Sequence, residues 1–320
     1  MSLSLGIVGT NFVSDWLAEA VAKTDAADAV AVFSRKQETG DAFAKKHNIP
    51  AVYTDFDTFL SSGIQAVYLA SPTFCHFAQA KAALEKGLHV LCEKPLVMKR
   101  DECETLYAIA KERGVLLMEA MRPAHDPAFA RVKESLADLG AIRRVSFEYC
   151  QYSSRYDRFK NGEVLNAFTP AISGGALFDI GIYPLFWCVA LFGKPKAVKA
   201  DSVFLSNGFE GSGCLLLDYD GFTASVTYSK ICDSVIPSVI TGEMGSLTIY
   251  KPQSPEKILY LPRKGEAVML DYMPAENNLV YEVEDFARAV KNGCGGVFDT
   301  FTRNLYDTLD LAVKAAGIEF

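Results

Sequence analysis

The stretch GIVGTNFVSDW, residues 6–16, decides how the rest of the chain is interpreted. An apolar run, a glycine turn and a helix-like segment follow one another, as they do where a dinucleotide-binding sheet begins. In the G-x-G-x-x-G frame Gly9 is present, while Asn11 and Ser14 take the second and third glycine positions. Asparagine tolerates left-handed backbone angles and serine is small, so the turn geometry is still possible. Taken alone, the stretch fits a cofactor loop and an ordinary strand–helix turn equally well.

The pattern of this first unit repeats along the first 120 residues. Short apolar runs follow at 29–34, 51–53, 66–70, 88–92 and 115–120. Continuous apolar runs of this length are typical of buried parallel strands. The segments between them carry apolar residues at helical spacing and often end in glycine, as helix C-termini do. The sequence therefore predicts an α/β Rossmann domain with a doubly wound parallel sheet over residues 1–122.

The pattern of apolar residues changes after Pro123. A helix-like segment at 129–140 precedes several long strand-like runs, and two helix-like segments at 281–293 and 302–317 close the chain. Asp220-Gly221 stands between alternating runs and predicts a tight hairpin. Residues 123–320 are therefore predicted to form an α+β domain with a large, mostly antiparallel open sheet.

Composition narrows the class of partner. The 320 residues are 50% apolar and carry 32 basic against 39 acidic side chains, a net charge of −7. This balance argues against nucleic acid or an anionic membrane as partner and favours a small molecule. The start has no basic signal-peptide region, and the apolar run at 183–192 is too short to cross a bilayer. We expect a cytoplasmic protein.

The cysteines and histidines show no metal-ligand spacing. No CxxC pair occurs, most cysteines lie in apolar runs, and the four histidines are scattered. We expect reduced core thiols and no metal. The cysteines are at positions 75, 92, 103, 150, 188, 214, 232 and 294.

The end of the second apolar run bears on the choice of cofactor. An NAD-selective fold usually has a carboxylate there, whereas this chain has Ser34 and Arg35. A hydroxyl and a guanidinium suit a 2′-phosphate, so NADP(H) is favoured over NAD(H), which remains possible. The alternative is an exposed basic helix start with no ligand.

Two further stretches contain candidate catalytic groups. In CEKPLV, residues 92–97, Lys94 follows an apolar run and is kept from helical angles by Pro95. In SGGALFDIGIYPLFW, residues 173–187, Asp179 and Tyr183 stand four apart, so one helix would bring them to one face. Pro184 predicts a bend near Tyr183. The alternative is a glycine-rich helix start in which the aspartate caps and the tyrosine packs.

These motifs together, in this order, resemble those of the Gfo/Idh/MocA oxidoreductases over essentially the whole chain. The matching segments are GIVGTN, Ser34-Arg35, VYLASPTFCH at 67–76, HVLCEKPL at 89–96 and GGALFDIGIYPL at 174–185. The resemblance implies a Rossmann domain and a second domain whose open sheet faces the substrate. It also implies a homodimer or homotetramer assembled through that sheet.

The resemblance assigns roles residue by residue. Lys94 matches the family's catalytic lysine and Asp179 its motif aspartate, while Tyr183 stands where many members have histidine. Tyrosine there is similar to the trans-dihydrodiol dehydrogenase, xylose dehydrogenase and glucose-fructose oxidoreductase branch, which tends toward NADP, and makes inositol dehydrogenase activity less expected. The implied cofactor-binding residues are Gly9, Thr10, Asn11, Phe12, Ser34, Arg35, Ser71, Pro72, Thr73, His76, Glu93 and Lys94.

The chemistry open to these groups is hydride transfer between nicotinamide and a carbinol carbon, with one proton moved by the protein. We hypothesise that Tyr183 exchanges this proton, that Lys94 stabilises the phenolate and polarises the carbonyl, and that Asp179 orients Lys94 or a substrate hydroxyl. In an equally simple variant Lys94 takes the proton itself. The predicted function is an NADP(H)-dependent oxidoreductase for a sugar, polyol or related cyclic alcohol. A non-catalytic NAD(P)-binding regulator is the alternative, which retention of all three residues disfavours.

Overall fold

The computed structural model describes residues 2–293 and 295–319. The chain forms two compact units. Unit 1 comprises the described residues up to His125 together with those of Ala275–Thr300, and unit 2 comprises Asp126–Pro274 together with the described residues from Phe301 on. The predicted boundary at 122 lies close to the transition at 125. The segment 275–300, which the sequence analysis placed in the second domain, instead belongs to unit 1.

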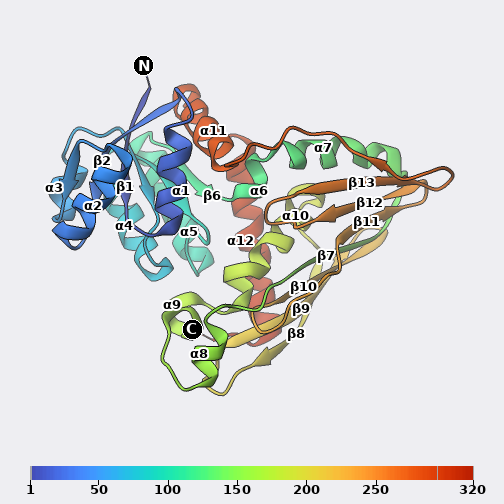
Figure 1. Ribbon diagram of the computed structural model, residues 1–320. Coiled ribbons are helices and arrows are strands. Elements are labelled where there is room, and N and C mark those ends of the chain that lie inside the picture. Colours follow the sequence, from blue (N-terminus) through green and yellow to red (C-terminus); the bar gives the residue numbers. More distant parts are fainter. Residues whose placement is uncertain (1, 294, 320) are drawn as a thin grey trace. The chain divides into compact units, whose positions relative to one another are not determined.

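Unit 1 is the doubly wound α/β fold that the sequence predicted. Its parallel strands lie in the order β3-β2-β1-β4-β5-β6, with helices on both faces (Figure 1). The elements are β1 (Leu3–Val8), α1 (Phe12–Val21), β2 (Ala27–Phe33), α2 (Gln37–His47), β3 (Ala51–Tyr53), α3 (Phe56–Leu60), β4 (Ala66–Leu69), α4 (Thr73–Glu85), β5 (His89–Glu93), α5 (Arg100–Arg113), β6 (Leu117–Ala120), α6 (Arg122–His125) and α11 (Leu279–Asn292).

The strand register brings the predicted cofactor residues to one edge of this sheet. Val8 at the end of β1 is level with Phe33 on one side and with Leu69 on the other. Leu69 is in turn level with Cys92 of β5. The turns that follow these strands therefore share the carboxyl edge, where the strand order reverses between β1 and β4 and where such sheets bind ligands.

Helix α11 explains why the segment 275–300 joins unit 1. Leu279, Val283 and Phe286 repeat at helical spacing, are almost fully buried, and share one core with Leu5 and Ile7 of β1. Gly293, with φ +66°, caps the helix in the left-handed conformation that glycine allows. The periodicity thus predicted the helix, but long-range packing decided which core it completes.

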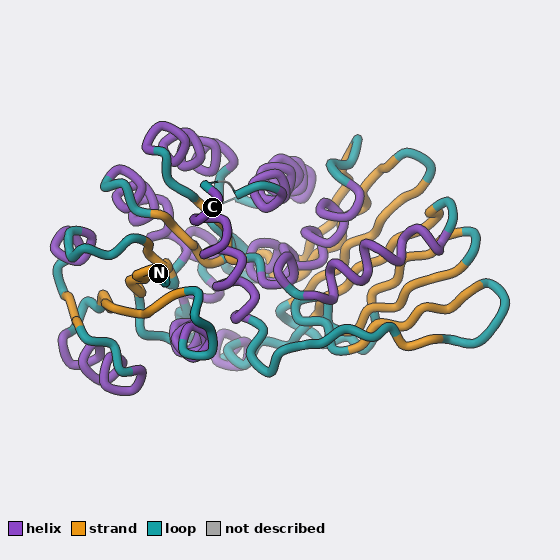
Figure 2. The backbone as a smooth tube through the Cα atoms, turned by 90° about the horizontal axis from the view of Figure 1, so that it is seen from above, coloured by secondary structure: helices purple, strands orange, loops and turns teal. Residues whose placement is uncertain are grey.

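Unit 2 is an α+β fold around one broad sheet of eight strands. The order is β14-β13-β12-β11-β7-β10-β9-β8, and all neighbours are antiparallel except the parallel pair β7 and β10. Figure 2 shows these long strands side by side. The elements are α7 (Pro127–Ser135), η1 (Leu136–Leu139), β7 (Ile142–Cys150), α8 (Tyr156–Lys160), η2 (Asn166–Phe168), α9 (Pro170–Ser173), η3 (Leu177–Gly181), α10 (Ile182–Phe192), β8 (Ala197–Phe204), β9 (Glu210–Tyr219), β10 (Phe222–Ser229), β11 (Ser238–Gly242), β12 (Gly245–Tyr250), β13 (Lys257–Pro262), β14 (Val268–Met269) and α12 (Val297–Ala316), which begins in unit 1.

The core of unit 2 is aromatic. The ring of Trp187 on α10 stacks on Phe147 of β7 at a centroid distance of 5.6 Å and lies 5.2 Å from Phe129 of α7. Its indole N–H, buried with the ring, donates to the carbonyl of Pro252 at 2.7 Å. This packing holds α10 against the sheet and fixes the 252 turn to the same helix. The hairpin predicted at Asp220-Gly221 joins β9 and β10.

The helical run Pro170–Phe192 is longer than the apolar stretch that the sequence analysis considered. At 23 residues it is long and apolar enough to span a membrane by length and composition, and 83% of its most apolar window is buried inside the structure. A core helix has both properties.

The seven described cysteines are free. Cys92, Cys103 and Cys188 are core residues as expected, but Cys214 and Cys232 are exposed. The expectation for Cys294 lies outside the described residues.

Candidate functional site

The turn between β1 and α1 in unit 1 is shaped for close approach of the backbone. Gly9 has φ +105°, and a Cβ there would lie 3.2 Å from the carbonyl oxygen of Ala70. Asn11 caps α1 with extended backbone angles: its Oδ1 accepts from the N–H groups of Val13 (2.9 Å) and Ser14 (3.2 Å). Its Nδ2 donates to Ala70 at 2.6 Å. Asn11 therefore makes no use of left-handed angles and instead ties the turn to the end of β4.

This turn fits the pyrophosphate of a dinucleotide. A helix N-terminus attracts anions through its dipole and its first N–H groups. Because Asn11 occupies the N–H groups of residues 13 and 14, those of Thr10, Asn11 and Phe12 are the ones we expect to face the phosphates. Ser14, fully buried in the third glycine position, lets α1 pack closely on the sheet.

The two predicted phosphate ligands after β2 differ in exposure. Ser34 is buried, and its Oγ lies 2.6 Å from Oγ1 of Thr39, so its hydroxyl is used inside the protein. Arg35 is exposed, and its positive charge reaches the first turn of α4. There burial raises the pKa of the Cys75 thiol, and the guanidinium of Arg35 offsets part of that rise. Arg35 is therefore the side chain available for a 2′-phosphate.

The turn after β4 is held by His76. The ring is buried; Nε2 lies 2.8 Å from the carbonyl oxygen of Ser71 and Nδ1 lies 2.9 Å from that of Pro95. Burial lowers the pKa of His76, and the hydrogen bonds to these two carbonyl oxygens oppose the shift. His76, predicted as a cofactor-binding residue, thus links the turn Ser71-Pro72-Thr73 to the loop that carries Lys94.

Lys94 follows the last residue of β5 directly, and its peptide bond to Pro95 is cis. Besides His76, the next strand holds this loop: the N–H of Leu96 donates to Oε1 of Glu119 at 2.9 Å. Glu119 lies on β6 and is buried. The lysine is therefore mounted on a loop fixed from both sides at the carboxyl edge of the sheet.

A buried acidic group lies beside this loop. The hydroxyl of Tyr68 donates to Oε1 of Glu93 at 2.5 Å. Burial raises the pKa of Glu93, although the Tyr68 hydrogen bond and the charges of Lys94 and Arg122 oppose the rise. Glu282 of α11 is fully buried, and its pKa lies well above the usual range because of burial and of the Glu93 charge. Glu282 therefore favours its neutral form.

In unit 2 the glycines of the stretch 173–187 shape the start of a helix. Gly175 has φ +99°, and a Cβ there would come within 2.8 Å of Oε2 of Glu210, which accepts from the N–H of Leu177 at 2.9 Å. A Cβ on Gly181 would meet the ring of Tyr228 at 2.7 Å. The glycines are therefore required so that the helix can lie directly on β9 and β10.

Asp179 and Tyr183 belong to one helical run, but it is not a uniform α-helix. Residues Leu177–Gly181 form a π-helical turn before α10 begins. Pro184 lacks an N–H and would clash with an α-helical carbonyl at residue 180, and a π turn accommodates such a position. The structure thus has a π turn directly before the segment that contains Tyr183, and the bend predicted there stays a prediction.

Asp179 is paired with a lysine that the sequence analysis did not single out. Nζ of Lys230 lies 2.8 Å from Oδ2 of Asp179. The Lys230 side chain is only 5% exposed, whereas that of Asp179 is 43% exposed. A lysine at the end of a strand gives no sequence signal that separates it from a surface lysine.

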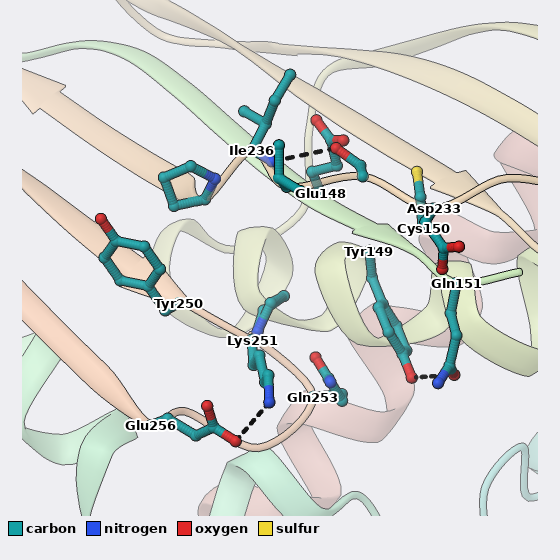
Figure 3. A pocket seen from close by; sticks show the side chains of 14 residues that line it. Glu148, Tyr149, Cys150, Gln151, Asp233, Ile236, Tyr250, Lys251, Gln253 and Glu256 are labelled. Carbon is teal, nitrogen blue, oxygen red and sulfur yellow. Dashed lines mark hydrogen bonds and ion pairs between the residues drawn. The ribbon is translucent and has the colours of Figure 1, made fainter.

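Tyr183 lies near a pocket formed wholly by unit 2. Its ring meets that of Tyr149 edge to face at a centroid distance of 6.0 Å. Tyr149 lines the pocket, which has a volume of about 340 Å³ and is bounded by the end of β7, by residues 233–237 and by the turn 250–256 (Figure 3). None of these pocket residues was predicted.

The pocket lining combines polar and apolar side chains, and its carboxylates outnumber its cations. Three carboxylates face it, and Lys251 is paired with one of them, Glu256, at 2.6 Å. Tyr149 donates to Gln151 at 2.9 Å, and Oε1 of Gln253 is buried without a hydrogen bond among the described residues. Such a lining offers many hydrogen bonds but little attraction for an anion. The polar side chains are Glu148, Tyr149, Gln151, Asp233, Ser234, Tyr250, Lys251, Gln253 and Glu256.

The predicted catalytic residues thus fall in both units, Lys94 in unit 1 and Asp179 and Tyr183 in unit 2. Their cooperation stays a prediction.

Known proteins resemble this chain over most of its length. It is 40% identical over 322 residues to the scyllo-inositol 2-dehydrogenase (NADP(+)) IolU of Bacillus subtilis, covering 99% of this chain and 98% of the relative. It is 28% identical to a D-xylose 1-dehydrogenase (NADP(+)) of Haloferax volcanii, covering 91% and 90%. In fold it matches the 3-ketoreductase KijD10 of Actinomadura kijaniata, with a TM-score of 0.88 at 23% identity, covering 99% and 98%.

Two family descriptions match separate parts of the chain. Residues 3–121 match the oxidoreductase family with an NAD-binding Rossmann fold, and residues 129–248 match the GFO/IDH/MocA C-terminal domain. With the 40% identical relative, these matches confirm the resemblance drawn from the sequence motifs. The chain belongs to the GFO/IDH/MocA oxidoreductase family.

Proposed function

We propose that this protein is an NADP(H)-dependent dehydrogenase of neutral cyclic polyols or sugars. The observation that carries the substrate class is the pocket beside Tyr183. Its volume of about 340 Å³ is at the small end of ligand pockets, which suits a molecule the size of a monosaccharide. Its carboxylates and amides can bind several hydroxyl groups. The negative charge of the carboxylates disfavours a phosphorylated substrate.

The cofactor preference is supported by Arg35. The guanidinium stands exposed at the end of β2, where a carboxylate would select NAD. The relatives from Bacillus subtilis and Haloferax volcanii both carry NADP(+) in their names. The former acts on an inositol, so cyclitols belong among the candidate substrates although Tyr183 had made them less expected.

The residue roles follow from chemistry. When bound, NADP(H) supplies or accepts the hydride. Tyr183 exchanges the proton of the substrate oxygen, because its phenol is the group able to donate and accept there. Lys94 stabilises the phenolate and the developing charge on the substrate oxygen. Asp179 orients a substrate hydroxyl.

The test is turnover of a substrate panel with NADP⁺ and NAD⁺. We expect activity with scyllo-inositol, myo-inositol or D-xylose, faster with NADP⁺, and none with glucose 6-phosphate. Tyr183→Phe should lower kcat by about 100-fold or more while NADPH binding is retained. Near-normal turnover in this variant would mean that Lys94, not Tyr183, exchanges the proton. Activity confined to phosphorylated sugars would contradict the pocket assignment.

We further propose a cytoplasmic homodimer or homotetramer. The net charge of −7, which argues against an anionic membrane as partner, supports the location. The broad open sheet of unit 2 supports assembly, since its strands β8 and β9 expose Val203, Phe204 and Leu216. Light scattering measures the mass.

A further inference from the structure

The lysine paired with Asp179 is almost completely buried. Lys230 follows the last residue of β10, and its side chain is 5% exposed. Removing an ammonium from water costs several kcal/mol unless charged and polar partners replace the water. Lysine is therefore rarely buried in this way unless its partners are fixed.

Three kinds of partner surround the Lys230 ammonium. Nζ lies 2.8 Å from the Asp179 carboxylate and donates to the carbonyl of Ala167 at 2.8 Å. It also lies 4.9 Å from the ring centroid of Phe168 and 5.2 Å from that of Phe209. Two aromatic faces and two oxygens hold the cation in one place.

The fixed ammonium of Lys230 affects the position of Asp179. This carboxylate sits on the π turn directly before α10, and it is much more exposed than its partner. A fixed buried cation on one side sets the direction of this carboxylate. In the proposed function, Asp179 orients a substrate hydroxyl.

We infer that Lys230 is a positioning residue, which holds Asp179 aligned for the reaction. This role rests on the proposed function, in which Asp179 orients the substrate. The alternative is that Lys230 only anchors residues 166–168 through Ala167 and Phe168, with no effect on catalysis beyond stability.

A double-mutant cycle separates the two roles. The variants are Lys230→Met, Asp179→Asn and the double variant, with wild type, and kcat, KM and Tm are measured for each. We expect Lys230→Met to lower kcat by about 10- to 100-fold. In the Asp179→Asn background the same change should leave kcat nearly unaltered, because a residue that acts through Asp179 has nothing left to position.

Two controls complete the design. Lys230→Arg keeps the charge and should restore part of the lost kcat. Lys194→Met breaks an ion pair with Asp307 on the surface of the same unit, where Lys194 is 54% exposed, and should leave kcat unchanged. NADPH binding should be the same in all variants.

The outcomes separate this inference from the proposed function. Wild type without NADP-linked turnover would overturn the proposed function and the Lys230 role with it. An active wild type with full kcat in Lys230→Met would overturn only the Lys230 role. Equal losses of kcat in both backgrounds, with a lowered Tm, would mean that Lys230 is a structural anchor.

Discussion

We propose that one side chain, Arg35, favours NADP(H) over NAD(H) in unit 1. Of the two predicted phosphate ligands, only Arg35 is exposed, because the Ser34 hydroxyl is turned inward to Thr39. A charge-assisted contact contributes about 1.5–3 kcal/mol. Arg35→Ala should therefore weaken NADPH binding by about 10- to 100-fold and leave NADH binding nearly unchanged. Titration that follows Trp16 fluorescence measures both constants.

Ser34→Ala and Lys45→Ala serve as controls for this prediction. Ser34→Ala should have a smaller effect than Arg35→Ala, and Lys45→Ala, an exposed change on α2, should have none. Equal loss of NADPH and NADH affinity in Arg35→Ala would assign Arg35 to another part of the cofactor.

Sequence patterns predicted some of these residues and missed others. Gly9 was predicted from the turn pattern, since its special angle is a local property, whereas Asn11 was expected to use left-handed angles and instead caps α1 with extended angles. Lys230 and Glu210 were missed, because their partners, the Asp179 carboxylate and the N–H of Leu177, lie far away in the chain. The roles of Lys94, Asp179 and Tyr183 came from a family motif and remain proposals.

At the scale of elements, the π turn depends on the missing side chain of Gly181. A Cβ there would lie 2.7 Å from the Tyr228 ring, which is buried and has little room to move. Gly181→Ala should lower the free energy of unfolding by about 1–3 kcal/mol and displace Asp179 and Tyr183. Thermal melting and kcat measure the two effects.

Gly208 is the matched control for a glycine in the same unit. Nothing lies within 4 Å of a Cβ at that position, although its φ is +80°. Gly208→Ala should cost less than Gly181→Ala and should leave kcat unchanged. If Gly181→Ala melts like wild type, the close contact does not determine the helix position.

Helix α11 introduces a pH dependence into unit 1. The pKa of Glu282 is raised by burial, so folding favours its protonated form. Its contribution to stability is therefore present below the ordinary glutamate pKa and is lost as pH rises through the folded pKa. Glu282→Gln should remove this loss, so its Tm advantage over wild type should be larger at pH 8 than at pH 5.

Glu276→Gln is the control for this charge change. Its side chain is 92% exposed and belongs to the same unit, so the pH dependence of Tm should follow that of wild type. A Tm difference for Glu282→Gln that is the same at both pH values would mean that Glu282 is not destabilised by ionisation.

At the scale of the whole molecule, periodicity predicted both sheets, because buried parallel strands and alternating strands have different patterns. The division of the chain into two units was harder to predict. The helical pattern of α11 indicates that one face is buried, but not in which core. The apolar face of α11 is completed by β1, some 270 residues earlier in the chain. Pairings at such separations leave no local trace in one sequence.

This division can be tested because each unit contains one of the two tryptophans, Trp16 in unit 1 and Trp187 in unit 2. Phe286 of α11 is 1% exposed in the core of unit 1. Phe286→Ala should cost about 3–5 kcal/mol of stability there. In denaturant, the transition seen by Trp16 in a Trp187→Phe background should move to lower concentration. The transition seen by Trp187 in a Trp16→Phe background should move less. Equal shifts would show that the two cores unfold as one cooperative unit, whereas a shift confined to Trp187 would contradict the assignment of residues 275–300 to unit 1.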